Sequence, residues 1–209
     1  MAYFNGKKIM FTAKSVFVNK AEEYDKGYSE GYVEGIEVGF NDGDAYRRAM
    51  MFGIIGRDFE TIEKEHLDGL PYVGGYAFYN YTKLKTIRLP ESVDHLKGAA
   101  FQNCTALTTV ELNETLKYIS ANAFQGCTAL TALTIPASVQ DIAGNALRIG
   151  SATNKATITM LGTTPPTISS TTFLIGSLSK IIVPVGCGEA YKTATNWSAF
   201  ADYIEEAAE

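Results

Sequence analysis

Apolar residues recur every 23 positions through most of the chain after residue 70. An Ala-Phe or Ala-Leu step begins at Ala77, Ala100, Ala123 and Ala146. Further apolar sets keep the same interval: Leu84, Leu107 and Leu130; Ile87, Val110 and Leu133; Leu89, Leu112 and Ile135; Val73, Leu96, Ile119 and Ile142. So many coincidences at one interval indicate an internal repeat.

Each repeat predicts a short strand, a turn, an apolar pair, and then the Ala-Phe step with its loop. The strands are LKTIRL, LTTVEL and LTALTI. A unit of this size cannot bury its apolar side alone, so neighbouring units must stack around one continuous core. KATITML at 155–161, with its register slipped by two residues, and LSKIIVP at 178–184 continue the series. The pattern predicts an α/β-type solenoid of about five coils over residues 57–209, with a C-terminal cap at about 185–209.

The stretches AFQNCTALTTVEL and AFQGCTALTALTI resemble the BspA-like bacterial class of leucine-rich repeats. The segment VPVGCGEAYKTATNW resembles the usual end of such arrays. Together the resemblance covers residues 70–206. It departs from the family pattern at Tyr81 and Gly150, where Cys is expected, and at Asn113, where Pro is common.

The solvent side of the strands is the candidate partner-binding surface. Alternation along a strand leaves every second side chain outside, and exposed strand faces are a common binding surface of solenoids. The candidate residues are Lys85, Thr86, Arg88, Thr108, Thr109, Glu111, Thr131 and Thr134. The alternative is structural, because threonines paired across strands also make a good β surface. No aromatic residue stands among them to stack on a sugar ring.

Five tetrads, YDKG-YSEG-YVEG-IEVG-FNDG, precede the repeats. Glycine costs a helix about 1 kcal/mol relative to alanine, yet glycine at every fourth position lets a second helix approach closely. We therefore expect residues 1–56 to attach and oligomerise the chain through a helix over 21–44, with a flexible linker as the alternative. The expected contacts are Tyr24, Gly27, Tyr28, Gly31, Tyr32, Gly35, Ile36, Gly39 and Phe40.

Composition narrows the function classes. The net charge of −5, from 18 basic and 23 acidic residues without basic clusters, argues against nucleic-acid binding. No apolar run is long enough for a signal peptide or a membrane span, so we expect synthesis in the cytoplasm and no membrane insertion.

The scattered cysteines and histidines predict no metal site. Cys104 and Cys127 share one repeat position, close enough for a disulfide on distance alone, although small inward-facing thiols are the favoured interpretation. Cys187 is expected to be the more exposed thiol. His66 and His95 lack catalytic partners, so we expect surface or turn residues, no cofactor and no enzyme.

The short N-terminus, the tetrads and the repeats in combination resemble phage or prophage structural proteins. That resemblance implies a tail-associated virion protein that binds copies of itself, other virion proteins, or a cell-surface protein or glycan. The alternative is a bacterial surface or secreted BspA-like adhesin that binds host proteins.

Overall fold

The computed structural model describes residues 2–4, 7–9 and 60–208. Strands β1 (Ala2–Phe4) and β2 (Lys7–Ile9) form an antiparallel pair. The predicted tetrad helix at 21–44, with all its expected contact residues, lies outside the described residues.

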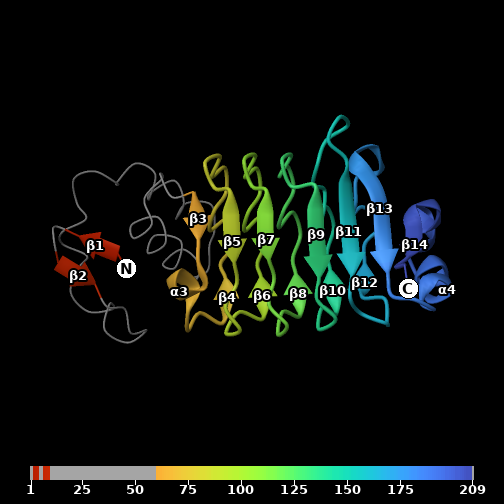
Figure 1. Ribbon diagram of the computed structural model, residues 1–209, viewed down its shortest axis with the longest axis horizontal. Coiled ribbons are helices and arrows are strands. Elements are labelled where there is room, and N and C mark those ends of the chain that lie inside the picture. The colour runs from red at the N-terminus through yellow and green to blue at the C-terminus, as the bar shows by residue number, and fades with distance from the viewer. Residues whose placement is uncertain (1, 5–6, 10–59, 209) are drawn as a thin grey trace.

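Residues 60–208 form a stack of short parallel strands that lie in two rows, one on each side of the stack (Figure 1). One side, called here the long-strand side, has two sheets: β3-β5-β7 and β9-β11-β13-β14. Its strands are β3 (Thr61–Ile62), β5 (Thr86–Arg88), β7 (Thr109–Glu111), β9 (Ala132–Ile135), β11 (Ala156–Met160), β13 (Leu178–Val183) and β14 (Ile204–Glu206).

The other side, the short-strand side, is one sheet of two-residue strands in the order β12-β10-β8-β6-β4. They are β4 (Tyr72–Val73), β6 (His95–Leu96), β8 (Tyr118–Ile119), β10 (Asp141–Ile142) and β12 (Thr167–Ile168). The helical segments are α3 (Lys64–Leu67), η1 (Ile175–Ser177), α4 (Gly188–Thr193) and η2 (Ser198–Tyr203). The predicted solenoid is confirmed. The sequence did not predict β3 at the first end of the long-strand side, β14 at its last end, or the strands of the short-strand side.

The strand register follows the 23-residue interval. Thr86 pairs with Thr109 and Arg88 with Glu111. From β9 to β11 the partner of Ala132 is Thr157, which is 25 positions on rather than 23. The predicted slip of two residues is therefore present, and the loop between β10 and β11 absorbs it.

The core consists of the residues that repeat. Ile87, Leu96 and Phe101 are fully buried, as are most of their equivalents in the other coils. The Phe101 ring stacks between those of Phe78 and Phe124, with centroids 5.1 and 5.3 Å away and planes within 4° and 8° of parallel. Each coil buries its apolar side chains against the next, so the stack forms one core.

Left-handed turns close each coil. Asn80, Asn103 and Gly126, at equivalent positions, have φ of 58°, 61° and 78°. Asparagine and glycine are the residues that adopt this conformation at least cost. The Asn103 amide also donates to Asn80 Oδ1 at 2.9 Å, so the turns are tied together from coil to coil.

Candidate partner-binding face

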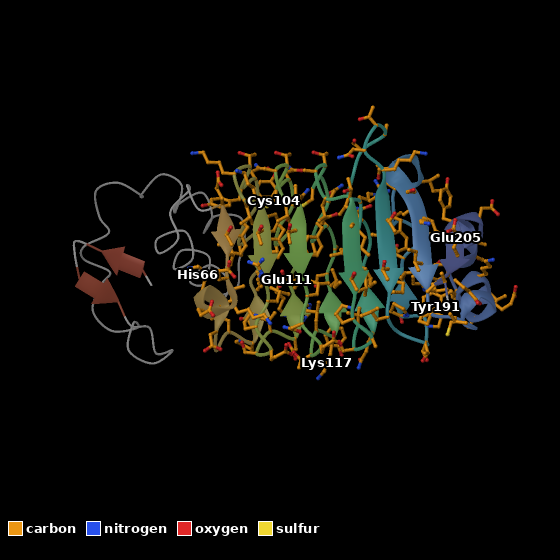
Figure 2. All side chains as sticks on the ribbon, in the orientation of Figure 1. His66, Cys104, Glu111, Lys117, Tyr191 and Glu205 are labelled. Carbon is orange, nitrogen blue, oxygen red and sulfur yellow. The ribbon has the colours of Figure 1, made fainter. Side chains whose placement is uncertain are left out.

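The eight candidate residues predicted from the sequence all lie on the long-strand side, and we call this set the strand face. Five are exposed and three are half-buried, and none is buried. They come from β5, β7, β9 and the residues just before these strands. Glu111 on β7 lies in the N-terminal half of the stack (Figure 2).

The N-terminal half of the strand face is ionic. The Arg88 guanidinium lies 2.7 Å from Glu63 Oε1 and 2.8 Å from Glu111 Oε1, which joins three successive coils. Lys85 pairs with Glu60 at 2.8 Å. The hydrogen bonds that Arg88 donates to Glu63, and then to Glu111, raise the pKa of Arg88. Its positive charge is therefore already matched by acidic groups of this chain.

Sequence reasoning missed Glu60 and Glu63. Both flank the two-residue strand β3, in which Ile62 pairs with Ile87 as the other repeats pair. The sequence signal that could have identified β3 is TIE at 61–63, whose first two residues match those of TIR at 86–88.

The C-terminal half of the long-strand side is uncharged until β13. Thr134 is paired with Thr159, and Ala132 with Thr157, in register. The next ion pair joins Lys180 to Glu205 at 3.2 Å. An ionic surface therefore meets a threonine surface between β7 and β9.

Aromatic residues lie instead on the short-strand side. Tyr72, His95 and Tyr118 occupy paired positions on β4, β6 and β8. The His95 and Tyr118 rings are 5.3 Å apart, and Lys97 Nζ lies 4.9 Å from the centre of the Tyr72 ring. Tyr118 is 39% exposed. This row was not predicted, because two-residue strands leave no alternation to detect.

The two histidines act as structural hydrogen-bonding groups. His66 Nδ1 accepts the Glu63 amide at 2.9 Å and closes the first turn of α3. His95 Nε2 lies 2.8 Å from Ser120 Oγ, part-buried in the array. In the described ranges, no three His, Cys, Asp or Glu side chains gather as metal ligands would.

Cys104 and Cys127 are free, fully buried thiols. Each donates to the carbonyl of a phenylalanine in the preceding coil, Phe78 or Phe101, at 3.1 Å. The interaction with Cys104, and then burial, raise the pKa of Cys127. The interpretation as inward-facing thiols is confirmed, and Cys187 is the half-buried one of the three.

The C-terminal cap covers the last coil with aromatic residues. Trp197 is fully buried, and its indole N–H donates to the Pro166 carbonyl at 2.8 Å. The Tyr191 hydroxyl donates to the Gly162 carbonyl at 2.7 Å, and burial raises the pKa of Tyr191 to about 12. Tyr191 lies at the C-terminal end of the stack (Figure 2). Glu206 accepts the amides of Gly186 and Gly188 at 2.9 and 2.8 Å, which fastens β14 to the start of α4.

Comparison with known proteins shows the family of this repeat. The BspA type Leucine rich repeat region matches residues 71–198 in six copies, which is more than half of the chain. The chain belongs to the BspA type leucine-rich repeat family. No curated protein matches it significantly. Among the parts of the chain that the structure describes, no helix is long and apolar enough to cross a bilayer.

This BspA-type chain is similar to several solved structures. A leucine-rich repeat protein of T. pallidum shares 27% identity with a TM-score of 0.49, over 64% of this chain and 62% of the other. The pneumococcal vaccine antigen PcpA shares 16% identity with a TM-score of 0.45, over 73% and 41%. A leucine-rich cell surface protein of Faecalibacterium prausnitzii shares 20% identity with a TM-score of 0.36, over 71% and 38%. The chain thus spans less than two thirds of the length of these relatives.

Proposed function

We propose that this chain is a non-enzymatic binding protein whose strand face contacts a partner protein. The observation that carries the proposal is the contrast between a repeated interior and a varied exterior on the same strands. Ile87, Val110 and Leu133 keep one apolar column, whereas the outward-facing column beside it changes from Arg88 to Glu111 to Thr134. Stacking requires the first column and leaves the second free to match a partner.

The charges of the strand face favour a partner whose contact surface is polar and carries few charges. Arg88 and Lys85 are paired internally with Glu63, Glu111 and Glu60. A partner that displaces these exposed pairs loses little, because surface ion pairs contribute only about 0–1 kcal/mol. Affinity from such a surface is modest for each copy.

We further propose that several copies are held together, which converts modest contacts into avidity. The tetrad residues of the N-terminal segment are the proposed self-association element. Two settings fit such a protein: a tail-associated virion protein that attaches to a cell, and a bacterial surface adhesin that binds host proteins. The family match is compatible with both.

The strand face is tested with the full-length chain carrying a fluorescent label. Binding is measured by flow cytometry on whole bacterial cells and by titration against immobilised extracellular-matrix proteins. Binding to bacteria favours the virion setting, and binding to matrix proteins favours the adhesin.

The variant Arg88→Ala/Glu111→Ala is expected to lower binding at least fivefold. Its matched control is Lys117→Ala/Gln140→Ala, two exposed residues of the short-strand side. If the control loses binding while the strand-face variant keeps it, the proposed surface is wrong.

Self-association is tested by solution mass at micromolar concentration. The full chain is expected to be oligomeric, and Gly31→Leu/Gly35→Leu is expected to give a monomer with an unchanged circular dichroism spectrum. A wild-type chain that is a strict monomer would remove the multivalent part of the proposal and leave the strand face untouched.

A further inference from the structure

The long-strand side is interrupted between β7 and β9. These strands are neighbours in the stack, yet they belong to separate sheets. Every other pair of adjacent strands on that side is joined by a ladder, from β3 to β7 and from β9 to β14. We call the boundary between β7 and β9 the seam.

Equivalent amides show what the seam lacks. The Thr109 amide donates to the Lys85 carbonyl at 3.0 Å, and the Leu89 amide donates to the Glu111 carbonyl at 2.9 Å. One coil later, the matching donors are the amides of Ala132 and Leu112. Within residues 60–208, neither makes the corresponding bond across the seam. The Val110 amide and carbonyl, which point away from β5 in a parallel ladder, also face the seam.

Packing changes at the same place. Ile87 and Leu133 are 0% and 3% exposed, but Val110 between them is only partly buried. Leu89 and Ile135 are 1% and 0% exposed, and Leu112 between them is again only partly buried. Main-chain bonding and apolar burial therefore weaken together at one boundary in the array.

The opposite side of the same two coils stays closed. Tyr118 pairs with Asp141 and Ile119 with Ile142 in the short-strand sheet. The Phe101 amide donates to the Ala123 carbonyl at 2.8 Å. One side of the boundary is therefore continuous, while the other is open.

Side-chain ties differ on the two sides of the seam. The buried Asn113 amide donates to the carbonyls of Pro90 and, at 2.8 Å, Val93, so it holds its coil to the preceding one. Arg88 and Glu111 add a second tie in the same direction. In the next coil the Asn113 position is Pro136, which has no donor, and the Glu111 position is the uncharged Thr134.

We infer that the array is jointed at the seam. The N-terminal coils, up to β7 and β8, and the C-terminal coils, from β9 onward, pivot about the paired strands β8 and β10. Opening separates Glu111 from Thr134 and so changes the spacing of the ionic and threonine halves of the strand face. The joint itself does not depend on the proposed function; only its effect on partner binding rests on it.

Amide exchange of the full-length chain, followed by NMR, is the first test. The Ala132 amide is expected to exchange at least about tenfold faster than the Thr109 amide, and the Leu112 amide at least about tenfold faster than that of Leu89. Equal protection in both matched pairs would overturn the inference.

A variant that ties the seam is the second test. Pro136→Asn places at the next coil the amide that Asn113 provides, and Thr134→Lys sets an exposed cation beside Glu111 as an independent tie. Either variant is expected to slow exchange of Ala132 and Leu112 at least about fivefold, while Thr109 and Leu89 stay unchanged.

Distances distinguish a moving joint from a fixed gap. Spin labels are placed at Thr82→Cys and Ser179→Cys, both exposed and on opposite sides of the seam, in a Cys187→Ser background. The joint predicts a broad distance distribution that Thr134→Lys or Pro136→Asn narrows. A distribution that is equally narrow with and without the tie would refute the joint, whatever the binding experiments show.

Discussion

Removing the central ring of the phenylalanine stack should measure how strongly neighbouring coils hold each other. Phe101 is fully buried, with a parallel ring on each side at 5.1 and 5.3 Å. Truncation of a buried phenylalanine to alanine costs about 3–5 kcal/mol, and each aromatic pair adds about 0.5–1.5 kcal/mol beyond its buried area. Because Phe101→Ala breaks two such pairs, we expect a loss at the upper end of the truncation range, about 4–5 kcal/mol in the free energy of unfolding.

Urea unfolding followed by two probes is the assay. Circular dichroism reports the whole stack, and fluorescence of Trp197, the single tryptophan of the chain, reports the cap. A repeat array can unfold in parts, so coincident transitions are required before the free energies are compared. The matched controls are Phe101→Leu, which keeps most of the volume, and Phe78→Ala, which removes a ring stacked on Phe101 from one side.

The expected order of destabilisation is Phe101→Ala, then Phe78→Ala, then Phe101→Leu. A loss below about 2 kcal/mol for Phe101→Ala, half of the expected value, would refute the argument that the ring stack couples three coils. A Phe101→Leu variant as unstable as Phe101→Ala would show that volume contributes little and that the aromatic contacts account for the loss.

Three further predictions concern a turn, the thiols and the cap. Gly126 has φ of 78°, a conformation that asparagine tolerates and a β-branched residue does not. Any Cβ there must displace the Asn103 side chain. Gly126→Val should therefore lower the urea midpoint clearly more than Gly126→Asn, which copies the equivalent turns at Asn80 and Asn103. With a thiol reagent at pH 8, Cys187 alone should react in the native chain, and all three cysteines should react in urea; rapid native modification of a second thiol would contradict the buried pair. The Gly186 and Gly188 amides hold the pKa of Glu206 below its ordinary value. The stability that the Glu206 carboxylate contributes is therefore present at neutral pH and is lost as pH falls through the folded-state pKa. The stability difference between wild type and Glu206→Gln should close on acidification, and a difference that is constant with pH would argue against the carboxylate's role.

The repeated interior could be predicted from the sequence because each apolar position recurs at 23 residues. This recurrence marks Ile87, Val110 and Leu133 as core positions. A two-residue shift in the same spacing reveals the slip before β11. Strands β3 and β14 could not be predicted in the same way. Each has two or three residues, which is too short for alternation, and each becomes a strand only because a neighbouring coil offers it a partner.

The short-strand sheet was missed for the same reason. Its inward residues Leu96 and Ile119 were recognised as a repeating apolar column, but the outward His95 and Tyr118 beside them follow no pattern. Their spacing depends on strand pairing across coils, which is a tertiary property. The ion ladder was also hidden, because Glu63 meets Arg88 only when β3 is known to be the first strand of the stack.

Positions that repeat every 23 residues are those that stacking requires. Positions that depart from the repeat mark coils whose contacts with their neighbours differ. Asn113 stands where Pro90 and Pro136 occupy the equivalent positions, and it lies beside the one interrupted boundary of the long-strand side. Its amide strengthens the contact with the coil before it and offers nothing to the coil after it. The residue that departs from the repeat therefore lies next to the seam, and the strand face crosses the seam between Glu111 and Thr134. A partner that contacts both Glu111 and Thr134 would bind a surface in which the distance between these residues depends on the seam. A side-chain tie placed across the seam should therefore alter the affinity for that partner, although no contact residue on the N-terminal half is changed.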